Sequence, residues 1–329
     1  MRIARWSTDD SVVEGVVVGD TAVAFPEGVT VAALLSGGLA QALNRQAEFE
    51  SGRGVPLTSV RLLAPIVPAS VRDFVAFEEH VEGVSASVDG KSEVVPEWYE
   101  APTFYFTNPH TVRGTGVRID VPETRRLDVE LELAAVIGSV PGSLGENLDP
   151  AAAAAHIFGY TVMNDWSARD LQSREMKVRL GPAKGKDFAL TLGPWIVTAD
   201  ELDPHLDDEG FLAIRAELHI NGELIGEDLV SNMGWPFSEL VAYASRNSVV
   251  VPGDVLGSGT VGNGGCLGEL WGRLADAAPP PLEPGDVVRM WIEGVGEIEN
   301  TVGDRVAAPR IPRARVRPRL RDRTDRHFS

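Results

Sequence analysis

Glycine and proline interrupt this chain throughout its length, with 34 Gly and 22 Pro among its 329 residues. Both residue types favour turns and end regular elements, so the segments between them are short. A bundle of long helices is therefore disfavoured. Because 43% of the residues are hydrophobic, the chain can still bury a substantial core, which excludes a disordered or collagen-like protein.

The first 68 residues are predicted to form a small unit of their own. Residues 16–25 have the pattern of two short strands around a Gly-Asp turn, which predicts a hairpin. Residues 31–49 carry leucines near helical spacing after Thr30, a suitable N-cap. An extended, proline-containing connector at residues 64–68 follows, and we place a domain boundary there. We therefore expect a small N-terminal β/α domain over residues 1–68.

Strand patterns dominate the chain from residue 69 to residue 309, which we expect to form the larger domain. Helices are expected at residues 150–158 and 236–246, each of which begins with proline. Residues 79–99 are polar and weakly periodic, as expected of a mobile loop. The predicted fold class is mixed, β-rich α+β. The expected strands span residues 127–137, 188–197, 213–220, 254–256 and 287–293.

Charge is distributed unevenly along the chain. The net charge is −18, although residues 310–329 contain eight arginines and only two aspartates. The acidic body disfavours contact with nucleic acid, because the phosphate backbone would be repelled, and it leaves room for a cation site. We interpret the Arg-rich C-terminal tail, residues 310–329, as a solvated end, with binding of RNA or an acidic partner as the alternative.

The sequence also carries weak indications of cellular location. No stretch approaches the ~18 consecutive apolar residues of a membrane-spanning helix, and the N-terminus is charged where a signal peptide is apolar. The single cysteine, Cys266, agrees with a reducing compartment, and we interpret it as a packing residue. We expect a cytoplasmic protein with no membrane partner.

Glu130 and Glu132 occupy alternate positions inside the apolar run Val129–Ile137. Side chains two apart in a strand point to the same side, so both carboxylates would face one way. Two buried carboxylates are costly unless a cation neutralises them, and all-oxygen ligands suit Mg²⁺, Ca²⁺ or Mn²⁺. The alternative is the solvent face of an ordinary strand, where glutamate is common.

The segment N-D-W-S-A-R-D-L-Q, residues 164–172, follows an apolar run. We expect a strand end here that turns into a short helix. Asp165 could then supply a third carboxylate, and Arg169 and Gln172, three apart, would face the same side of the helix. The alternative is that Asp165 caps the helix and forms an ordinary salt bridge with Arg169.

Two further segments carry candidate catalytic side chains. A loop rich in glycine contains Lys184 and Lys186, either of which could stabilise an oxyanion or enolate, although two exposed loop lysines are the simpler alternative. His80 could act as a general base if a carboxylate fixes the tautomer of its ring. Glu269, which follows a G-S-G-T motif at residues 257–260, could supply that carboxylate.

Taken in order, these segments resemble the fumarylacetoacetate hydrolase family. The matching motifs are E-x-E, N-D-W-S-A-R-D-x-Q, G-P-x-x-G-K-x-F, and G-S-G-T before a glutamate, over roughly residues 70–305. The resemblance implies a catalytic domain built as a twisted mixed β-roll, often preceded by a small N-terminal domain, and a homodimer. It also implies a role for each candidate residue. The metal would be bound by Asp73, Glu130, Glu132 and Asp165, and water would be activated by His80 and Glu269. The enolate would be stabilised by Lys186, and the substrate would be bound by Arg169, Gln172 and Thr260.

The resemblance implies a hydrolase that acts on carbon–carbon bonds of ketonic substances, as in aromatic amino acid breakdown. In such a reaction a β-diketo acid, similar to fumarylacetoacetate or an acylpyruvate, binds Mg²⁺ (or Ca²⁺ or Mn²⁺), which polarises a carbonyl. His80, oriented by Glu269, takes a proton from water, and the hydroxide attacks that carbonyl. The bond then breaks to an enolate that the metal and Lys186 stabilise.

Departures from the family pattern bear on the substrate. Ala76 and Phe77 replace the Asn-Tyr pair of many smaller bacterial members, which brings the chain nearer the fumarylacetoacetase type. However, Met176 stands where that type has a substrate-contacting tyrosine, and Asp89 stands where it has an arginine. The acyl group can therefore differ, and acylpyruvates, fumarylpyruvate and aromatic-degradation products are all candidates.

Two alternatives to this hydrolase remain. The first keeps the metal and the enolate but makes the protein an oxaloacetate decarboxylase or a hydroxy-diene-dioate isomerase of the same family. The His80 and Glu269 pair favours hydrolysis, because those reactions need no activated water. The second is a non-catalytic protein that binds a divalent metal.

Overall fold

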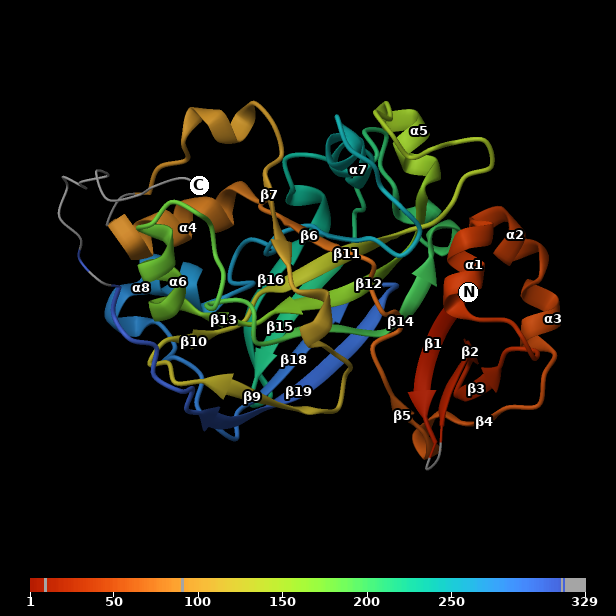
Figure 1. The fold of residues 1–329 in the computed structure, drawn as a ribbon, viewed down its shortest axis with the longest axis horizontal. Helices are drawn as coiled ribbons and strands as arrows, with labels where there is room; N and C mark the ends of the chain where they lie inside the picture. Colours follow the sequence, from red (N-terminus) through yellow and green to blue (C-terminus); the bar gives the residue numbers. More distant parts are fainter. Residues whose placement is uncertain (9–10, 90–91, 315, 317–329) are drawn as a thin grey trace, which may run out of the picture.

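Two β-sheets pack face to face in the centre of the molecule (Figure 1). The computed structural model describes the chain except for residues 9–10, 90–91, 315 and 317–329. Alternate residues of strand β11 (Leu131–Ile137) point to the second sheet, where they meet alternate residues of strand β18 (Val287–Ile292) in one apolar core. The fold is a mixed, β-rich α+β fold, as predicted.

The larger sheet contains twelve of the described strands, and the acidic motifs lie near its middle. Its strands are β1 (Arg2–Ser7), β2 (Val12–Val18), β3 (Thr21–Ala24), β4 (Val55–Pro56), β5 (Arg61–Leu62), β6 (Val71–Phe74), β7 (Phe104–Thr107), β8 (Val112–Arg113), β11, β12 (Ile157–Asp165), β14 (Leu190–Thr198) and β17 (Val255–Gly257). The strand order is β4-β3-β2-β1-β14-β12-β11-β17-β6-β7, with β5 paired to β1 and β8 paired to β14.

The remaining strands form a five-stranded sheet and a two-stranded sheet. The five-stranded sheet has the order β16 (Glu223–Leu229), β15 (Arg215–Ile220), β18, β19 (Gly296–Val306), β9 (Arg118–Pro122). The pair is β10 (Leu127–Asp128) with β13 (Ser167–Ala168). The helices are α1 (Val31–Gly37), α2 (Leu39–Asn44), α3 (Gln46–Glu50), α4 (Glu78–Asp89), α5 (Pro150–Ala155), α6 (Arg169–Met176), α7 (Phe237–Ser245) and α8 (Leu267–Leu274).

The N-terminal region extends the larger sheet. The hairpin predicted for residues 16–25 is confirmed as β2 and β3, and β1 pairs with β14. The single helix predicted over residues 31–49 is wrong, because the chain breaks into α1, α2 and α3. Gly38 adopts φ 81°, outside the helical region, and a Cβ there would lie 2.2 Å from the carbonyl oxygen of Ser139. The boundary at residue 68 stays a prediction.

The loop predicted over residues 79–99 is wrong in its first half, which forms helix α4 against α8 (Figure 1). Gly83 made this segment look weakly helical, but a Cβ at that position would lie 2.3 Å from Cγ of Glu269. Close packing of two helices therefore requires the glycine. The tertiary contact, rather than local propensity, stabilises α4.

The ends of other helices and strands also differ from the predicted ones. The alanine-rich helix predicted to reach residue 158 ends at Ala155, because residues from Ile157 onward pair with β11 as β12. The strand predicted over residues 127–137 divides into β10 and β11, which pair with different partners. The other four predicted strands and the helix at 236–246 are confirmed with small shifts of their ends.

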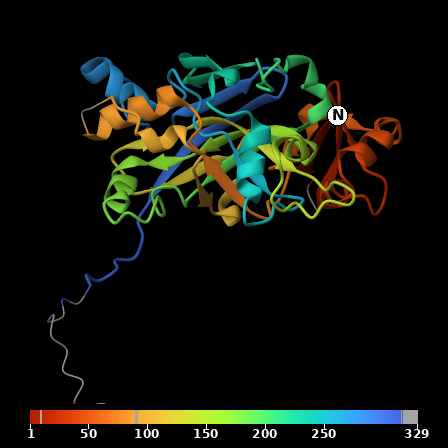
Figure 2. The same ribbon diagram turned by 90° about the horizontal axis from the view of Figure 1, so that it is seen from above.

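Two predictions concern the termini and membranes. After β19 the chain leaves the body as an extended segment (Figure 2), and most of the Arg-rich tail, residues 310–329, lies outside the described residues. None of the helices in the described ranges combines the length and hydropathy that a membrane-spanning helix needs.

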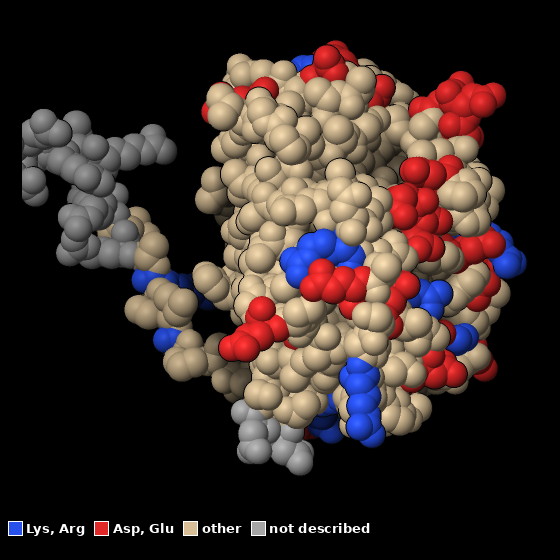
Figure 3. All heavy atoms as spheres, turned by 90° about the vertical axis from the view of Figure 1, so that its right-hand side faces the viewer, with Lys and Arg blue, Asp and Glu red and all other residues tan. Residues whose placement is uncertain are grey.

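On the face beside the N-terminal region, acidic and basic side chains both stand scattered over an otherwise uncharged surface (Figure 3).

Candidate active site

Four buried carboxylates gather where neighbouring strands of the larger sheet end. Asp73 lies on β6, Glu132 on β11, Glu130 just before β11, and Asp165 at the end of β12, each at most 5% exposed. Carboxylate oxygens of Asp73, Glu130 and Glu132 lie within 4.8 Å of one another. The alternative of a solvent-facing E-x-E strand is therefore wrong.

A glycine allows two of these acids to meet. Strand β17 lies between β11 and β6, and its residue Gly257 stands opposite Asp73. A Cβ on Gly257 would lie 2.7 Å from Oε2 of Glu132 and 2.9 Å from Oδ1 of Asp73. Because Gly257 has no side chain, the carboxylates of two non-adjacent strands can approach over it, together with Cε of Met163.

Two cations pair with one side of this carboxylate cluster. Lys186 Nζ donates to Oδ2 of Asp165 at 2.7 Å and also to Glu130. Arg169 Nη2 lies 2.7 Å from Oε1 of Glu130. The side chain of Lys186 is 5% exposed, whereas that of Lys184 is 70% exposed, so the alternative of two exposed lysines is wrong for Lys186.

The pKa shifts set Glu130 apart from the other three acids, because burial raises the pKa of Asp165 as well, against the opposing effect of Lys186. Burial raises the pKa values of Asp73 and Glu132 well above their usual range, and neighbouring acids raise them further. Burial would also raise the pKa of Glu130, but Lys186 and Arg169 outweigh it and lower that pKa. The negative charge of Glu130 is thus compensated by protein cations, while that of Asp73 and Glu132 is not.

The cluster has the donor set that a divalent cation requires. Oδ1 of Asp73 and Oδ1 of Asp165 are buried and have no hydrogen-bond partner among the described residues. Buried oxygens without partners cost free energy, and a bound cation would satisfy them. Because every donor is an oxygen, the residues fit a hard cation such as Mg²⁺, Mn²⁺ or Ca²⁺.

Tyr105 joins this cluster, and the sequence analysis missed it. The residue lies on β7 directly opposite Asp73 on β6. Its hydroxyl lies within hydrogen-bond distance of Oδ2 of Asp73, at 2.9 Å, and of Oδ2 of Asp165, so the two carboxyls share its one proton. Burial, reinforced by Asp165, raises the pKa of Tyr105 well above its usual range, so the hydroxyl keeps its proton. The pairing of β7 with β6 is non-local, and no local pattern signals it.

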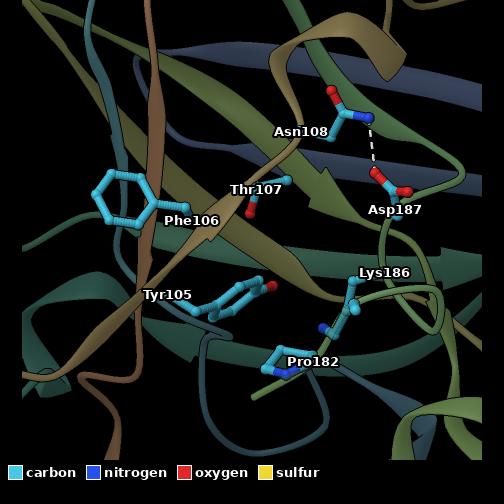
Figure 4. Close-up of a pocket in the computed structure, with 8 residues that line it drawn as sticks. Tyr105, Phe106, Thr107, Asn108, Pro182, Lys186 and Asp187 are labelled. Atoms are coloured by element: carbon cyan, nitrogen blue, oxygen red, sulfur yellow. Dashed lines mark hydrogen bonds between the residues drawn. The ribbon is translucent and has the colours of Figure 1, made fainter. Parts of the chain in front are cut away.

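A pocket of about 390 Å³ opens beside the cluster (Figure 4). Tyr105 and Lys186, which both contact the cluster, also line this pocket. Its other lining residues are Phe106, Thr107, Asn108, Pro182, Ala183 and Asp187. A small polar molecule in the pocket would therefore reach Tyr105 and Lys186, which contact the carboxylates.

His80 on α4, Glu269 on α8 and Cys266 just before α8 come together beside the cluster. One ligand atom from each of the three residues lies within 4.8 Å of the others. Nδ1 of His80 is 3.6 Å from Sγ of Cys266, and Nε2 is 3.9 Å from Oε1 of Glu130. In the described residues no hydrogen bond joins His80 to Glu269. Cys266 is fully buried, as its interpretation as a packing residue requires, but it also contacts His80.

Burial shifts the pKa values of this pair in opposite directions. It lowers the pKa of His80 to about 4, against the opposing effect of Glu130. It raises the pKa of Glu269 to about 7, although Arg273, at 2.7 Å, opposes the shift. The imidazole is therefore neutral near pH 7 and can accept a proton.

The remaining predicted substrate residues lie around the same site. Arg169 Nη1 donates to Oε1 of Gln172 at 3.1 Å, so both face one side of α6 as predicted. Thr260 is buried just after β17. Asp165 does not cap α6, whose N-cap is Ala168, so that alternative is wrong. Met176 is 49% exposed at the end of α6, and the side chain of Asp89 lies outside the described residues.

Most of the chain matches known proteins. Residues 69–303 match the family model described as "Fumarylacetoacetate (FAA) hydrolase C-terminal". The chain is 31% identical over 259 residues to a fumarylacetoacetase of Arabidopsis thaliana, a match that covers 65% of this chain and 61% of that protein. The chain thus spans about three fifths of the length of that relative.

Solved structures match nearly the whole chain. A 2-hydroxyhepta-2,4-diene-1,7-dioate isomerase from Mycobacterium marinum is 25% identical, with a TM-score of 0.63 over 92% of this chain and 98% of that one. A maleylpyruvate hydrolase from Sphingobium sp. SYK-6, in complex with manganese(II) and pyruvate, is 20% identical, with a TM-score of 0.68 over 93% of this chain and all of that one. Because the identity to the maleylpyruvate hydrolase is only 20%, that match shows a shared fold and nothing more.

Proposed function

The chain belongs to the fumarylacetoacetate hydrolase family, and on that premise we propose that it is a metal-dependent enzyme that hydrolyses a carbon–carbon bond of a β-diketo acid. The substrate would be similar to fumarylacetoacetate or an acylpyruvate. The observation that carries the proposal is the buried carboxylate cluster, which has unpaired oxygens and is flanked by Lys186 and His80.

The residues that would hold the metal are Asp73, Glu130, Glu132 and Asp165. A divalent cation bound there supplies Lewis acidity toward a substrate carbonyl. Mg²⁺ and Mn²⁺ both suit these donors. Tyr105, whose hydroxyl lies within hydrogen-bond distance of Asp73 and Asp165, would then stand at the wall of the pocket.

His80 would act as the general base. Its lowered pKa keeps the imidazole neutral near pH 7, and Nε2 lies on the side of Glu130 and the cluster. Water held between Nε2 and the substrate would lose its proton to Nε2. Glu269, which has a carboxylate oxygen within 4.8 Å of a His80 ring nitrogen, would stabilise the protonated imidazole through its charge.

Lys186 would stabilise the enolate that leaves when the carbon–carbon bond breaks. Burial opposes its charge, but Asp165 and Glu130 raise the pKa of Lys186 above its ordinary value, so Nζ stays protonated. A fixed ammonium in a buried site stabilises developing negative charge without reorganisation of water. Arg169, Gln172 and Thr260 would hold the carboxylate and acyl parts of the substrate.

The second candidate is isomerisation of an unsaturated hydroxy-diacid or decarboxylation of oxaloacetate. The likeness to the isomerase from M. marinum supports it. His80 and Glu269 favour hydrolysis, because the second candidate needs no activated water. A non-catalytic metal-binding protein is the third possibility. On the family resemblance alone, we also propose a homodimer located in the cytoplasm.

A substrate panel tests the proposal. The loss of β-diketone enol absorbance is followed for fumarylacetoacetate, fumarylpyruvate and simple acylpyruvates, with oxaloacetate alongside, in Mg²⁺, in Mn²⁺ and in EDTA. We expect cleavage of at least one diketo acid that stops in EDTA and returns with metal. Consumption of oxaloacetate alone would instead establish the decarboxylase. Tight metal binding with no turnover of any compound would favour the non-catalytic protein.

A further inference from the structure

His80, Cys266 and Glu269 form a second buried cluster with a chemistry unlike that of the carboxylate cluster. Cys266 and Glu269 are fully buried and His80 is 7% exposed. A thiol, an imidazole and a carboxylate together favour borderline or soft transition metals, whereas the all-oxygen cluster favours hard cations. The two clusters meet at His80, whose Nε2 lies 3.9 Å from Glu130.

The sulfur–nitrogen distance in this second cluster fits tetrahedral coordination. In a tetrahedral zinc site, sulfur at about 2.3 Å and nitrogen at about 2.0–2.1 Å from the metal lie roughly 3.5 Å apart. Nδ1 of His80 and Sγ of Cys266 are 3.6 Å apart. A carboxylate oxygen of Glu269 completes a set of three within 4.8 Å. Three ligands would leave one coordination position for water.

An unpaired oxygen independently indicates a missing partner. Oε1 of Glu269 accepts from the backbone amide of Gly264 and pairs with Arg273, but Oε2 is buried without a hydrogen-bond partner in the described ranges. A buried carboxylate oxygen in that state is costly unless something binds it.

We propose that His80, Cys266 and Glu269 bind a zinc-type cation and that its binding switches off the activity proposed above. On binding, the thiol of Cys266 loses its proton to solvent and the metal replaces the proton on Nδ1 of His80. The single ring proton then resides on Nε2. A ring in that tautomer has no lone pair left to accept a proton from water, so the general base is lost. This consequence rests on the proposed function, whereas the metal site does not.

Cobalt spectroscopy tests the site without any activity measurement. Cys266 is the only cysteine in the chain, so a thiolate-to-cobalt charge-transfer band in the full-length protein can arise only from this residue. We expect the band on titration with Co²⁺ in excess Mg²⁺, its loss in Cys266→Ser and Cys266→Ala, and its displacement by Zn²⁺. Absence of the band in the unmodified protein would overturn the proposal.

The other two ligands are tested by affinity. His80→Ala and Glu269→Gln should each weaken Co²⁺ binding by roughly 10- to 100-fold or more, judged from the same band. Unchanged affinity in both variants would show that Cys266 binds cobalt alone, which would overturn the three-residue site. Far-ultraviolet circular dichroism of each variant establishes that it is folded before the titration is interpreted.

The inhibitory role is tested separately, with a substrate from the panel above. Zn²⁺ in excess Mg²⁺ should reduce turnover at least about tenfold in the unmodified protein but much less in Cys266→Ser, each compared with its own zinc-free rate. Equal inhibition of both proteins would place the inhibitory zinc in the carboxylate cluster and overturn the switch. If no substrate is found, the proposed function fails, while the cobalt band still decides the metal site.

Discussion

One face of strand β11 has polar surroundings at one end of the strand and apolar surroundings at the other. Glu130 and Glu132 project into the carboxylate cluster at one end. Ala134 and Val136, the next residues on that face, lie in an apolar core shared with the N-terminal region. Both ends are buried and the backbone hydrogen-bonds to neighbouring strands along its length.

The difference teaches that the covering segments, rather than the strand, determine whether a buried position is polar or apolar. The apolar end is covered by residues of α1 and β1, such as Leu35 and Ile3. The acidic end is faced by Asp73 from β6 and by Lys186 from the loop after α6. The apolar end should therefore contribute mainly to stability, and the acidic end mainly to chemistry.

The largest expected effect comes from removing one charge at the acidic end. Glu132→Gln should lower kcat/KM by about 10³-fold, because a metal's Lewis acidity is worth several kcal/mol and about 1.4 kcal/mol is a factor of ten. Steady-state kinetics on the substrate found in the panel measures this. The control is Glu227→Gln, an exposed carboxylate on β16. Near-normal activity in Glu132→Gln would contradict the assignment of the acidic end to catalysis.

The two lysines of one loop sharpen the same contrast between buried and exposed charge. Lys186→Met should lower kcat by about 10²- to 10³-fold through loss of enolate stabilisation. Lys184→Met, on an exposed side chain two residues earlier, should leave kcat nearly unchanged. Because Lys186 also neutralises Glu130, thermal unfolding must show that the variant is folded. Equal activity of the two variants would remove Lys186 from the reaction.

Metal binding should stabilise the acidic end specifically. At a free Mg²⁺ or Mn²⁺ concentration of 100 Kd, binding stabilises the folded state by about 2.7 kcal/mol, so Tm rises on titration and falls again in EDTA. Glu132→Gln should abolish most of this rise, because it removes a carboxylate ligand of the metal. A full metal-dependent rise in Glu132→Gln would place the metal elsewhere.

The smallest expected effect lies at the apolar end. Val136→Ala should lower the free energy of unfolding by about 1–3 kcal/mol, since it removes buried methyl groups and leaves a cavity, and it should leave kcat unchanged. Urea denaturation measures the loss. Val12→Ala, on a side chain 55% exposed, is the matched control and should change stability much less. A drop in kcat for Val136→Ala without unfolding would show that the two ends are coupled.

Most of the acidic end could be predicted from the sequence. Glu130, Glu132, Asp165 and Lys186 belong to short local motifs, and the structure brings all four together. The β-rich fold class and most strand positions were also predictable, because alternation of apolar residues and turn residues are local properties. The roles assigned to these residues stay proposals, as does the division of the chain at residues 68 and 309.

Other parts of the site depend on contacts between residues far apart in the chain. Tyr105 reaches the acids because β7 pairs with β6, and Cys266 lies beside His80 because α4 packs on α8. The glycine that makes α4 look like a loop is the residue that permits this packing.

By itself, then, the sequence determined which side chains carry charge and nucleophilic atoms and which segments form most of the strands, although not where each strand begins and ends. Only the tertiary structure decided which strands adjoin one another, that Gly257 leaves room for Asp73 and Glu132 to meet, and that Cys266 lies close to His80 and Glu269. The reason is physical. Local patterns follow from the conformational preferences of a few neighbouring residues, whereas pairings across more than a hundred residues depend on the packing of the whole core.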